Sequence, residues 1–453
     1  MPVHSVAAAP PLWTVFPFVL YLLMIALVPL FLGHFWEHNR NKLLVAAVIS
    51  APVVGYLLLS DPRGAMLLHH SVREYLAFLT LLGSLFVISG GVYLRGELAG
   101  TPLVNTAFLA IGAVLASLVG TTGASMLLIR PLLRANQARQ RKVHMVVFFI
   151  FIVSNGAGML TPLGDPPLFL GFLRGVDFLW TLKLFAPWAL VNGALLLIFN
   201  FLDQAILDKE ELERPGSELK EVQRIDEPLS IQGGINFVWL AGVVLVIFLT
   251  GRYGASISPS ADVQALLGIA GMAALAMLSL ATTSSAVRKA NQFSWAPIIE
   301  VAVIFVGIFV TMVPALAYLE ANGASLGITE PWQFFWASGI LSSFLDNAPT
   351  YLTFTSMAVG VVNAADPSAA LQADHLGLLA AHPLGSLYLT AISCGAVFMG
   401  ANSYIGNGPN FMVKAIAEDS GIKMPSFFGY MAWSCGILIP LFVIVTFLFF
   451  RAQ

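Results

Sequence analysis

The sequence has too few charged residues for a water-soluble protein. Lys, Arg, Asp and Glu make up 10% of its 453 residues, whereas 58% of the residues are hydrophobic. A soluble globular protein carries about 25% charged residues. A chain with this composition cannot cover its surface with polar groups, so the lipid bilayer has to be its solvent. The sequence therefore predicts an all-α membrane protein that crosses the bilayer many times.

Cysteines are also few, and their positions argue against a disulfide or a metal site. The two cysteines, Cys394 and Cys435, both lie in apolar segments, which favours small core residues over a disulfide or a metal site. The net charge of −2 says little about partners, and nothing in the sequence suggests nucleic acid. We therefore expect no nucleic-acid partner.

Apolar runs long enough to cross the hydrocarbon, about 20 residues each, occur ten times. They are residues 13–33, 43–60, 73–94, 143–173, 178–202, 236–251, 262–281, 297–319, 385–413 and 426–450. Two further apolar stretches, 103–133 and 333–363, are interrupted at their middle by GTTG (120–123) and by DNAP (346–349). We expect each to be a re-entrant hairpin, whose two arms meet at mid-depth and return to the starting side.

Lys and Arg are missing from two predicted loops, 320–332 and 363–384. They occur in all four predicted loops of the other side, which are 34–42, 134–142, 203–235 and 282–296. Because Lys and Arg concentrate in cytoplasmic loops, the bias places the N-terminus outside. We expect the protein to lie in a bacterial inner membrane. The bias holds only if both interrupted stretches are hairpins, since making either one a crossing would invert every later loop.

The two halves of the chain resemble each other in sequence. The segment EYLAFLTLLGSLF from Glu74 parallels EVAVIFVGIFVTM from Glu300, and ASLVGTTGASMLL from Ala116 parallels SSFLDNAPTYLTF from Ser342, both at an offset of 226. TPLGDPPLFL, from 161, parallels SYIGNGPNFM, from 403, at an offset of 242. Each half holds five crossings and one hairpin, and an odd number of crossings turns the second half upside down.

The predicted organisation is therefore an inverted repeat. Its parts are a first repeat over 13–203 with the hairpin 103–133 and the broken helix 143–173, a charged cytoplasmic linker over 204–235, and a second repeat over 236–450 with the hairpin 333–363 and the broken helix 385–420. Inverted repeats with interrupted helices at matching positions are typical of secondary transporters, whose site lies at the bilayer midplane.

Helix-breaking residues occur in both halves where a membrane helix would otherwise continue. They are Pro162, Gly164, Pro166 and Pro167 in the first half, and Gly406, Gly408 and Pro409 in the second. In hydrocarbon every backbone N–H and C=O needs a partner, so a broken helix is tolerated only where it lines a protein-enclosed site. The freed carbonyls become oxygen ligands, and the C-terminal end of a half-helix favours a cation.

Each half offers one acid near its break: Asp165 in the first break and Asp346 at the tip of the second hairpin. An ionisable group at the membrane centre costs at least about 2.5 kcal/mol, so we interpret both as functional. Neutral oxygens come from Thr121, Thr122, Thr161, Ser403, Asn347 and Asn407. Such ligands suit a small hard cation. A carboxylate that is protonated when the site is empty, and ionised when it holds a cation, would exchange one for the other.

Three segments resemble the NhaD-type and CitMHS-like sodium:proton antiporters: SNGAGMLTPLGDPPLFLGFLRGVDFLWT, SSFLDNAPTYLTF and GANSYIGNGPNFMVKAIAE. These families belong to the ion transporter superfamily, with the arsenite pumps and the sodium-coupled di- and tricarboxylate carriers. The resemblance runs from about residue 13 to 450. It implies a homodimer in the lipid bilayer, with a scaffold domain, an elevator-type transport domain, Na⁺ and H⁺ as transported ions and no other cofactor.

The resemblance also implies two ion-binding clusters, formed by the hairpin tips and the helix breaks. By position, the first cluster is Thr121, Thr122, Gly123, Asn155, Thr161 and Asp165, and the second is Asp346, Asn347, Ser403 and Asn407. The preferred hypothesis is a sodium/proton antiporter, not an enzyme.

Alternatives stay open at this point. A sodium-coupled carboxylate or an oxyanion transporter is one; the tips of the carboxylate carriers resemble Ser-Asn-Thr motifs, and an Asp at a tip would repel a tricarboxylate unless bound sodium offset its charge. An intramembrane aspartyl protease is remote, because a GxGD motif would need glycine where Pro162 stands, and Asp346 follows the PAL at 314–316. A channel is a further alternative, since mirrored broken helices also build pores.

Overall fold

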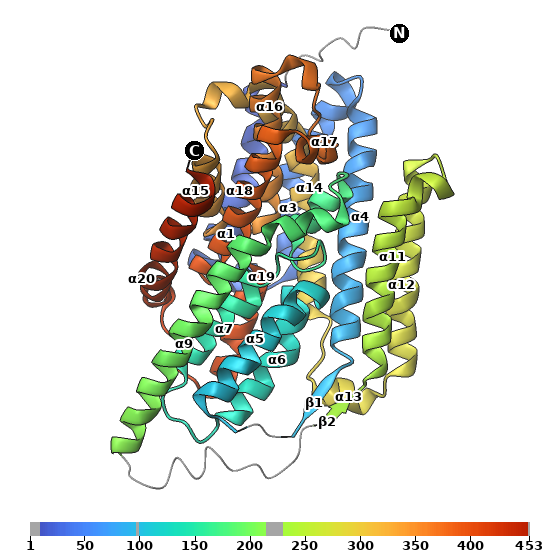
Figure 1. Cartoon of the computed structure of the whole chain (residues 1–453). Helices are drawn as coiled ribbons and strands as arrows, with labels where there is room; N and C mark the ends of the chain where they lie inside the picture. Colours follow the sequence, from blue (N-terminus) through green and yellow to red (C-terminus); the bar gives the residue numbers. More distant parts are fainter. Residues whose placement is uncertain (1–9, 97–98, 214–229, 452–453) are drawn as a thin grey trace.

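The computed structural model of the chain describes residues 10–96, 99–213 and 230–451, and it is almost entirely helical (Figure 1). The elements of the first half are η1 (Leu12–Val15), α1 (Phe16–Phe31), α2 (Gly33–Trp36), α3 (Asn39–Ser60), α4 (Gly64–Ser89), β1 (Tyr93–Arg95), α5 (Pro102–Val119), α6 (Thr121–Ala135), α7 (Val143–Phe151), η2 (Ile152–Gly156), α8 (Pro166–Leu173), η3 (Phe178–Leu184) and α9 (Phe185–Glu213).

The second half of the chain follows the linker. Its elements are β2 (Ser230–Gln232), α11 (Ile235–Ile257), α12 (Ala261–Thr282), α13 (Ser285–Ala290), α14 (Ala296–Asn322), η4 (Gly323–Leu326), α15 (Pro331–Ser342), α16 (Asn347–Ala365), η5 (Pro367–Ala369), α17 (Leu376–Ala381), α18 (Pro383–Met399), η6 (Gly400–Asn402), α19 (Gly408–Asp419), α20 (Phe427–Val445) and η7 (Thr446–Phe450).

The prediction of an all-α protein that crosses the membrane many times is confirmed. Within the described residues, 10 helices are long and apolar enough to span a bilayer. One of them differs from the predicted ten: Pro102–Val119 qualifies by length, whereas the predicted crossing 143–173 does not, because its helix breaks after Gly156. The predicted linker 204–235 is helical up to Glu213, and its residues 214–229 lie outside the described part.

A small antiparallel sheet joins the two halves at one end of the molecule. Tyr93 of β1 lies opposite Gln232 of β2, and Figure 1 shows both strands beside α13. The predicted crossing 73–94 ends earlier than expected, since α4 stops at Ser89 before two glycines. Three-residue strands in loops are too short to give the alternating pattern from which a strand is predicted.

Prolines mark the starts of the helices that surround the breaks. Pro102, Pro166, Pro331, Pro383 and Pro409 each lie in the first two positions of their helix. The first N–H groups of a helix have no intrahelical acceptor, so proline loses nothing there, and its fixed φ suits the helix.

The first predicted hairpin begins and ends at the same end of the molecule. At its base the amides of Asn105 and Asn136 donate to each other at 2.8 and 3.0 Å. Between its arms Gly120 has φ +82°, a conformation that other residues rarely adopt, so the chain reverses there. In Figure 1 α5 and α6 lie toward the end with β1 and α13, whereas α16 and α17 lie toward the opposite end.

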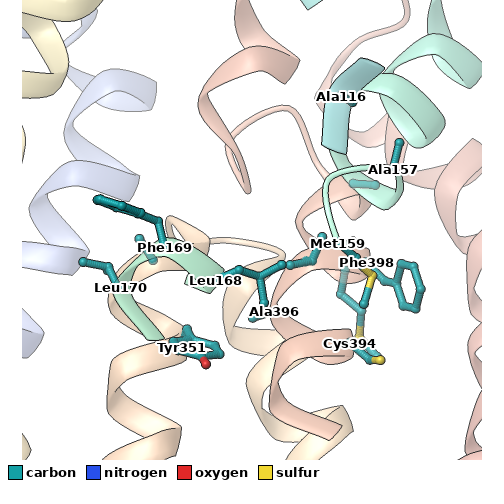
Figure 2. Close-up of a cluster of buried hydrophobic side chains, with 14 of the residues drawn as sticks. Ala116, Ala157, Met159, Leu168, Phe169, Leu170, Tyr351, Cys394, Ala396 and Phe398 are labelled. Atoms are coloured by element: carbon teal, nitrogen blue, oxygen red, sulfur yellow. The ribbon is translucent and has the colours of Figure 1, made fainter. Parts of the chain in front are cut away.

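The most deeply buried segments are those that lead into the breaks. Met145 to Val153, at the end of α7 and in η2, are all at most 1% exposed. Figure 2 shows apolar side chains beside the breaks, where Leu168 of α8 lies near Ala396 and Met159. Both cysteines are free. Cys394 is buried in this region, as predicted. Cys435 is exposed on α20, so the prediction that it is a core residue was wrong.

Buried ion pairs fix the two ends of the molecule. The Arg174 guanidinium, after α8, donates to both carboxylate oxygens of Glu74 on α4 at 2.8 and 2.9 Å, and to the carbonyl of Ala373 at 3.1 Å. At the end with the strands, Arg139 donates to Asp203 at 2.9 Å and to Glu210 at 2.8 Å, both on α9. These pairs tie the segments around the breaks to long helices.

We predict that Glu74→Gln destabilises the protein strongly, because it leaves Arg174 buried with a neutral partner. Breaking a buried pair costs about 3–5 kcal/mol, whereas an exposed pair is worth about 0–1 kcal/mol. The matched control is Asp262→Asn. Asp262 pairs with Arg73, the neighbour of Glu74 on α4, and the Asp262 side chain is 59% exposed. Thermal unfolding of detergent-purified protein should show a clear loss for Glu74→Gln and almost none for the control; equal melting temperatures would contradict the assignment.

We also predict that Gln137 and Ala370 lie on opposite sides of the membrane. Both residues are exposed, Gln137 between α6 and α7 and Ala370 beside α17. Single cysteines at these positions, in a variant without Cys394 and Cys435, should react with an impermeant thiol reagent from opposite sides of intact cells and inverted vesicles. Reaction from the same side would refute both the hairpins and the inverted repeat.

Candidate functional site

Both hairpin tips and both helix breaks meet at one place in the structure. In the first half the N–H of Thr121, at the tip, donates to the carbonyl of Gly164, in the break, at 2.8 Å. In the second half the hydroxyl of Ser403, in the break, donates to the carbonyl of Ser343, before the tip. The halves join where the amide of Asn347 donates to Asp165 at 2.5 Å. Residues far apart in sequence therefore build one polar centre within an apolar core.

Asp165 is the centre of this group, and it is 1% exposed. Its carboxylate accepts from the hydroxyl of Thr121 at 3.0 Å, from the Asn347 amide at 2.5 Å and from the Asn407 amide at 3.3 Å. The residue stands directly before α8 but does not cap that helix. Pro166 and Pro167 have no N–H to offer, so the carboxylate is free to face the site.

Asp165 differs from every other fully buried acid among the described residues in having no basic partner. Glu74 is paired with Arg174, and Asp203 and Glu210 are paired with Arg139. A buried carboxylate that receives only neutral donors carries a charge that nothing fixed offsets. A mobile cation or a proton is what can offset it.

Asp346 lies close enough to repel Asp165 electrostatically, but it holds a different position from the predicted one. Its carboxylate caps α16 by accepting from the N–H of Ala348 at 3.0 Å. The second cluster expected around it does not assemble, because Asn347 and Asn407 turn to Asp165 instead. These two residues reach Asp165 because the fold places the second tip and the second break against the first break.

Thr161 and Ser403 fasten each break to the neighbouring hairpin in the same way. Thr161 donates its hydroxyl hydrogen to the carbonyl of Ser117, as Ser403 does to that of Ser343. A second matched pair runs from the Ser117 hydroxyl to the carbonyl of Ala157 (2.5 Å) and from the Ser343 hydroxyl to that of Met399 (3.1 Å). In a third pair, the N–H of Leu163 donates to the Thr161 hydroxyl (3.1 Å), and the N–H of Ile405 donates to the Ser403 hydroxyl (3.2 Å). Identical bonds at the predicted offsets support the repeat, which as a whole stays a prediction.

Three other predicted ligands do not contact Asp165. Asn155 is buried beside the second break, where its amide donates to Asn410 at 2.7 Å and its oxygen accepts from Asn407 at 3.2 Å. Thr122 makes no side-chain hydrogen bond within the described part of the chain. Gly123 packs against the end of α4, where a Cβ on residue 123 would lie 2.7 Å from the Ser89 hydroxyl.

The glycines of the two breaks are required by close backbone packing. A Cβ on Gly164 would collide with the carbonyl of Gly158, and one on Gly406 would collide with that of Gly400. Each break therefore folds back on itself over six residues, and only glycine leaves the necessary space.

Ser117, Ser343 and Asn410 are site residues that the sequence reasoning missed. Ser117 and Ser343 are identical at the offset of 226, so the alignment of the halves contained the signal. Asn410 corresponds to Leu168 at the offset of 242, so a search for shared polar positions passes over it.

The chain was also compared with known proteins. No curated protein matches it. A family model described as "Putative citrate transport" matches residues 7–450, which is nearly the whole chain. The match agrees with the CitMHS-like part of the resemblance, while the NhaD-type part stays a prediction. The chain therefore belongs to this CitMHS-type family of transporters.

Proposed function

We propose that the protein is a secondary active transporter that exchanges Na⁺ for H⁺ at Asp165. One observation carries the proposal: Asp165 is the fully buried acid that has no basic partner among the described residues, whereas the other three are paired with arginine. Its charge is therefore available to an ion that comes and goes. The resemblance adds a homodimer and an elevator-type motion in a bacterial inner membrane, with the N-terminus outside, to this proposal.

The oxygen atoms around Asp165 suit a small hard cation. The carboxylate supplies the charge, and the hydroxyl oxygen of Thr121 lies 3.0 Å from it. The side-chain oxygen of Asn347 is buried without a hydrogen-bond partner in the described structure, although its amide nitrogen contacts Asp165. An unpaired buried oxygen is costly, and a cation bound by the carboxylate would relieve that cost. These are oxygen donors of the kind that hard cations prefer.

Protons and sodium would compete at this position. Burial disfavours the charged form of a carboxyl group, and Asp165 is 1% exposed. Asp346 adds a second negative charge nearby, since its neighbour Asn347 contacts Asp165. Without a cation, a proton on Asp165 removes the charge; with sodium bound, the carboxylate is ionised and the proton leaves. Asp346 and Asp165 share no hydrogen bond, in contrast to the paired acids that an aspartyl protease would need.

Sodium-coupled transport of citrate or a similar carboxylate is the second candidate, and the family match favours it. The site's charge opposes it. Residues 117–123, 154–165, 343–349 and 400–410, which form the tips and breaks, contain no Lys or Arg. An anion would therefore meet two acids and no fixed positive charge, and it could bind only after cations had neutralised them.

We predict that Asp165→Asn and Asp346→Asn each abolish sodium-driven proton movement in proteoliposomes while the protein stays folded. Asn accepts hydrogen bonds and caps helices as well as Asp does, so each substitution removes mainly the charge. The control is Asp177→Asn, because Asp177 is exposed and caps η3 by accepting from Leu179 at 2.8 Å. Its exchange should equal wild type. Near-normal exchange by Asp165→Asn would refute the proposal. The same result for Asp346→Asn would show that Asp346 serves only as a structural helix cap.

We further predict that sodium binds without an organic anion and binds more weakly as the pH falls. Where proton and sodium compete for one carboxylate, each fall of one pH unit lowers the apparent sodium affinity by up to about tenfold. Sodium binding then releases a proton. Calorimetry on detergent-purified protein, in buffers of different ionisation enthalpy, measures both quantities. Sodium binding that appears only when citrate is present, or that is independent of pH, would favour the carboxylate transporter.

A further inference from the structure

The second break is built like the first, but its carbonyl oxygens are already occupied. The side-chain amide of Asn410 donates one hydrogen to the carbonyl of Gly400 at 2.8 Å and the other to the carbonyl of Ser403 at 2.9 Å. Asn410 is completely buried. Because a carbonyl oxygen cannot donate, these two contacts fix the orientation of the amide, with its nitrogen between the two carbonyls.

The first break has no such group at the equivalent position. The residues that correspond to Gly400, Ser403 and Asn410 at the offset of 242 are Gly158, Thr161 and Leu168. A leucine side chain cannot donate a hydrogen bond. The carbonyl of Gly158 receives no hydrogen bond from the described residues, and that of Thr161 receives only the turn N–H of Gly164 at 3.1 Å.

Charge differs between the breaks in the same sense. The counterpart of Asp165 in the second break is the neutral Asn407, which turns its amide to Asp165 at 3.3 Å. Asn407 is in turn held by the oxygen of Asn155, whose own nitrogen donates to the oxygen of Asn410. Three buried amides therefore form a linear hydrogen-bonded chain from Asp165 to the carbonyls of Gly400 and Ser403. The second break has donors where the first has acceptors and a carboxylate.

We propose that the chain binds one cation, at Asp165, and that the amide of Asn410 permanently fills the equivalent place in the second break. This inference rests on the proposed function and adds the stoichiometry of the site to it. The N–H groups of Asn410 satisfy the two carbonyls that a second cation would bind. Asn410 is thus a positioning residue: it holds Asn155, which holds the Asn407 amide against Asp165.

The first test counts sodium ions bound per chain at equilibrium, by calorimetry on detergent-purified protein with sodium as the only added ligand. Wild type should bind one sodium and Asp165→Asn none. Two sodium ions per wild-type chain, one of which persists in folded Asp165→Asn, would overturn the inference and leave the proposed exchange standing. A single sodium that persists in folded Asp165→Asn would refute both. No binding by wild type would refute both, so the two failures can be told apart.

The second test converts the filled position into an open one. Asn410→Asp removes the two N–H donors and adds a negative charge beside the carbonyls of Gly400 and Ser403, so it should bind two sodium ions per chain. The double variant Asp165→Asn, Asn410→Asp should bind one.

The matched control is Asn402→Asp in the same break, because the Asn402 amide donates to the hydroxyl of Ser343 at 2.9 Å and not to a pair of carbonyls. This control should keep one sodium. A folded Asn410→Asp that still binds only one would show that Asn410 does not occupy a cation position. If that variant fails to elute as folded protein, the counts for wild type and Asp165→Asn still decide the stoichiometry.

Discussion

The carboxylate of Asp165 has no fixed positive charge to balance it, and the surrounding structure is arranged around that fact. A buried ion without a partner costs several kcal/mol even after local relaxation. Three neutral donors, from Thr121, Asn347 and Asn407, recover part of that cost. They come from the first hairpin, the second hairpin and the second break, so both interruptions and both tips are needed to reach one residue. The remaining cost is what makes the binding of a cation or a proton favourable.

The ends of the molecule follow the opposite rule. Glu74 meets Arg174 on one side, and Arg139 meets Asp203 and Glu210 on the other, so each buried acid there is neutralised within the protein. Such pairs do not exchange ions with the solution, because each charge already has a partner at hydrogen-bond distance. The ends are thereby fixed by permanent pairs, whereas the acid at the centre has no basic partner among the described residues.

The sequence allowed the long helices and the breaks after α7 and α18 to be predicted, because each depends on local signals: apolar length, Gly and Pro. The re-entrant hairpins stay a prediction. The sequence did not allow the grouping of the side chains to be predicted. Asn347 and Asn407 lie 182 and 242 residues from Asp165, and only the folded chain decides that both turn to that acid and not to Asp346. Asp346 was predicted as a ligand from its residue type, and in the folded chain its carboxylate also caps α16, which the sequence did not indicate.

The two breaks differ in charge, although they share matched hydrogen bonds. Had both breaks carried an acid, two buried carboxylates would have stood within electrostatic reach of each other, and Asp346 already adds one negative charge nearby. With Asn407 in place of the second acid, the second break supplies a hydrogen-bond donor to the first. Its own carbonyls are satisfied by Asn410, so it needs no ion to remain folded. Under the proposed function, the first half would bind the cation and the second would support it. Any movement of the second tip or break would change the donors around Asp165 directly. Coupling between ion binding and the arrangement of the halves then requires no contact beyond those that Asn347 and Asn407 already make.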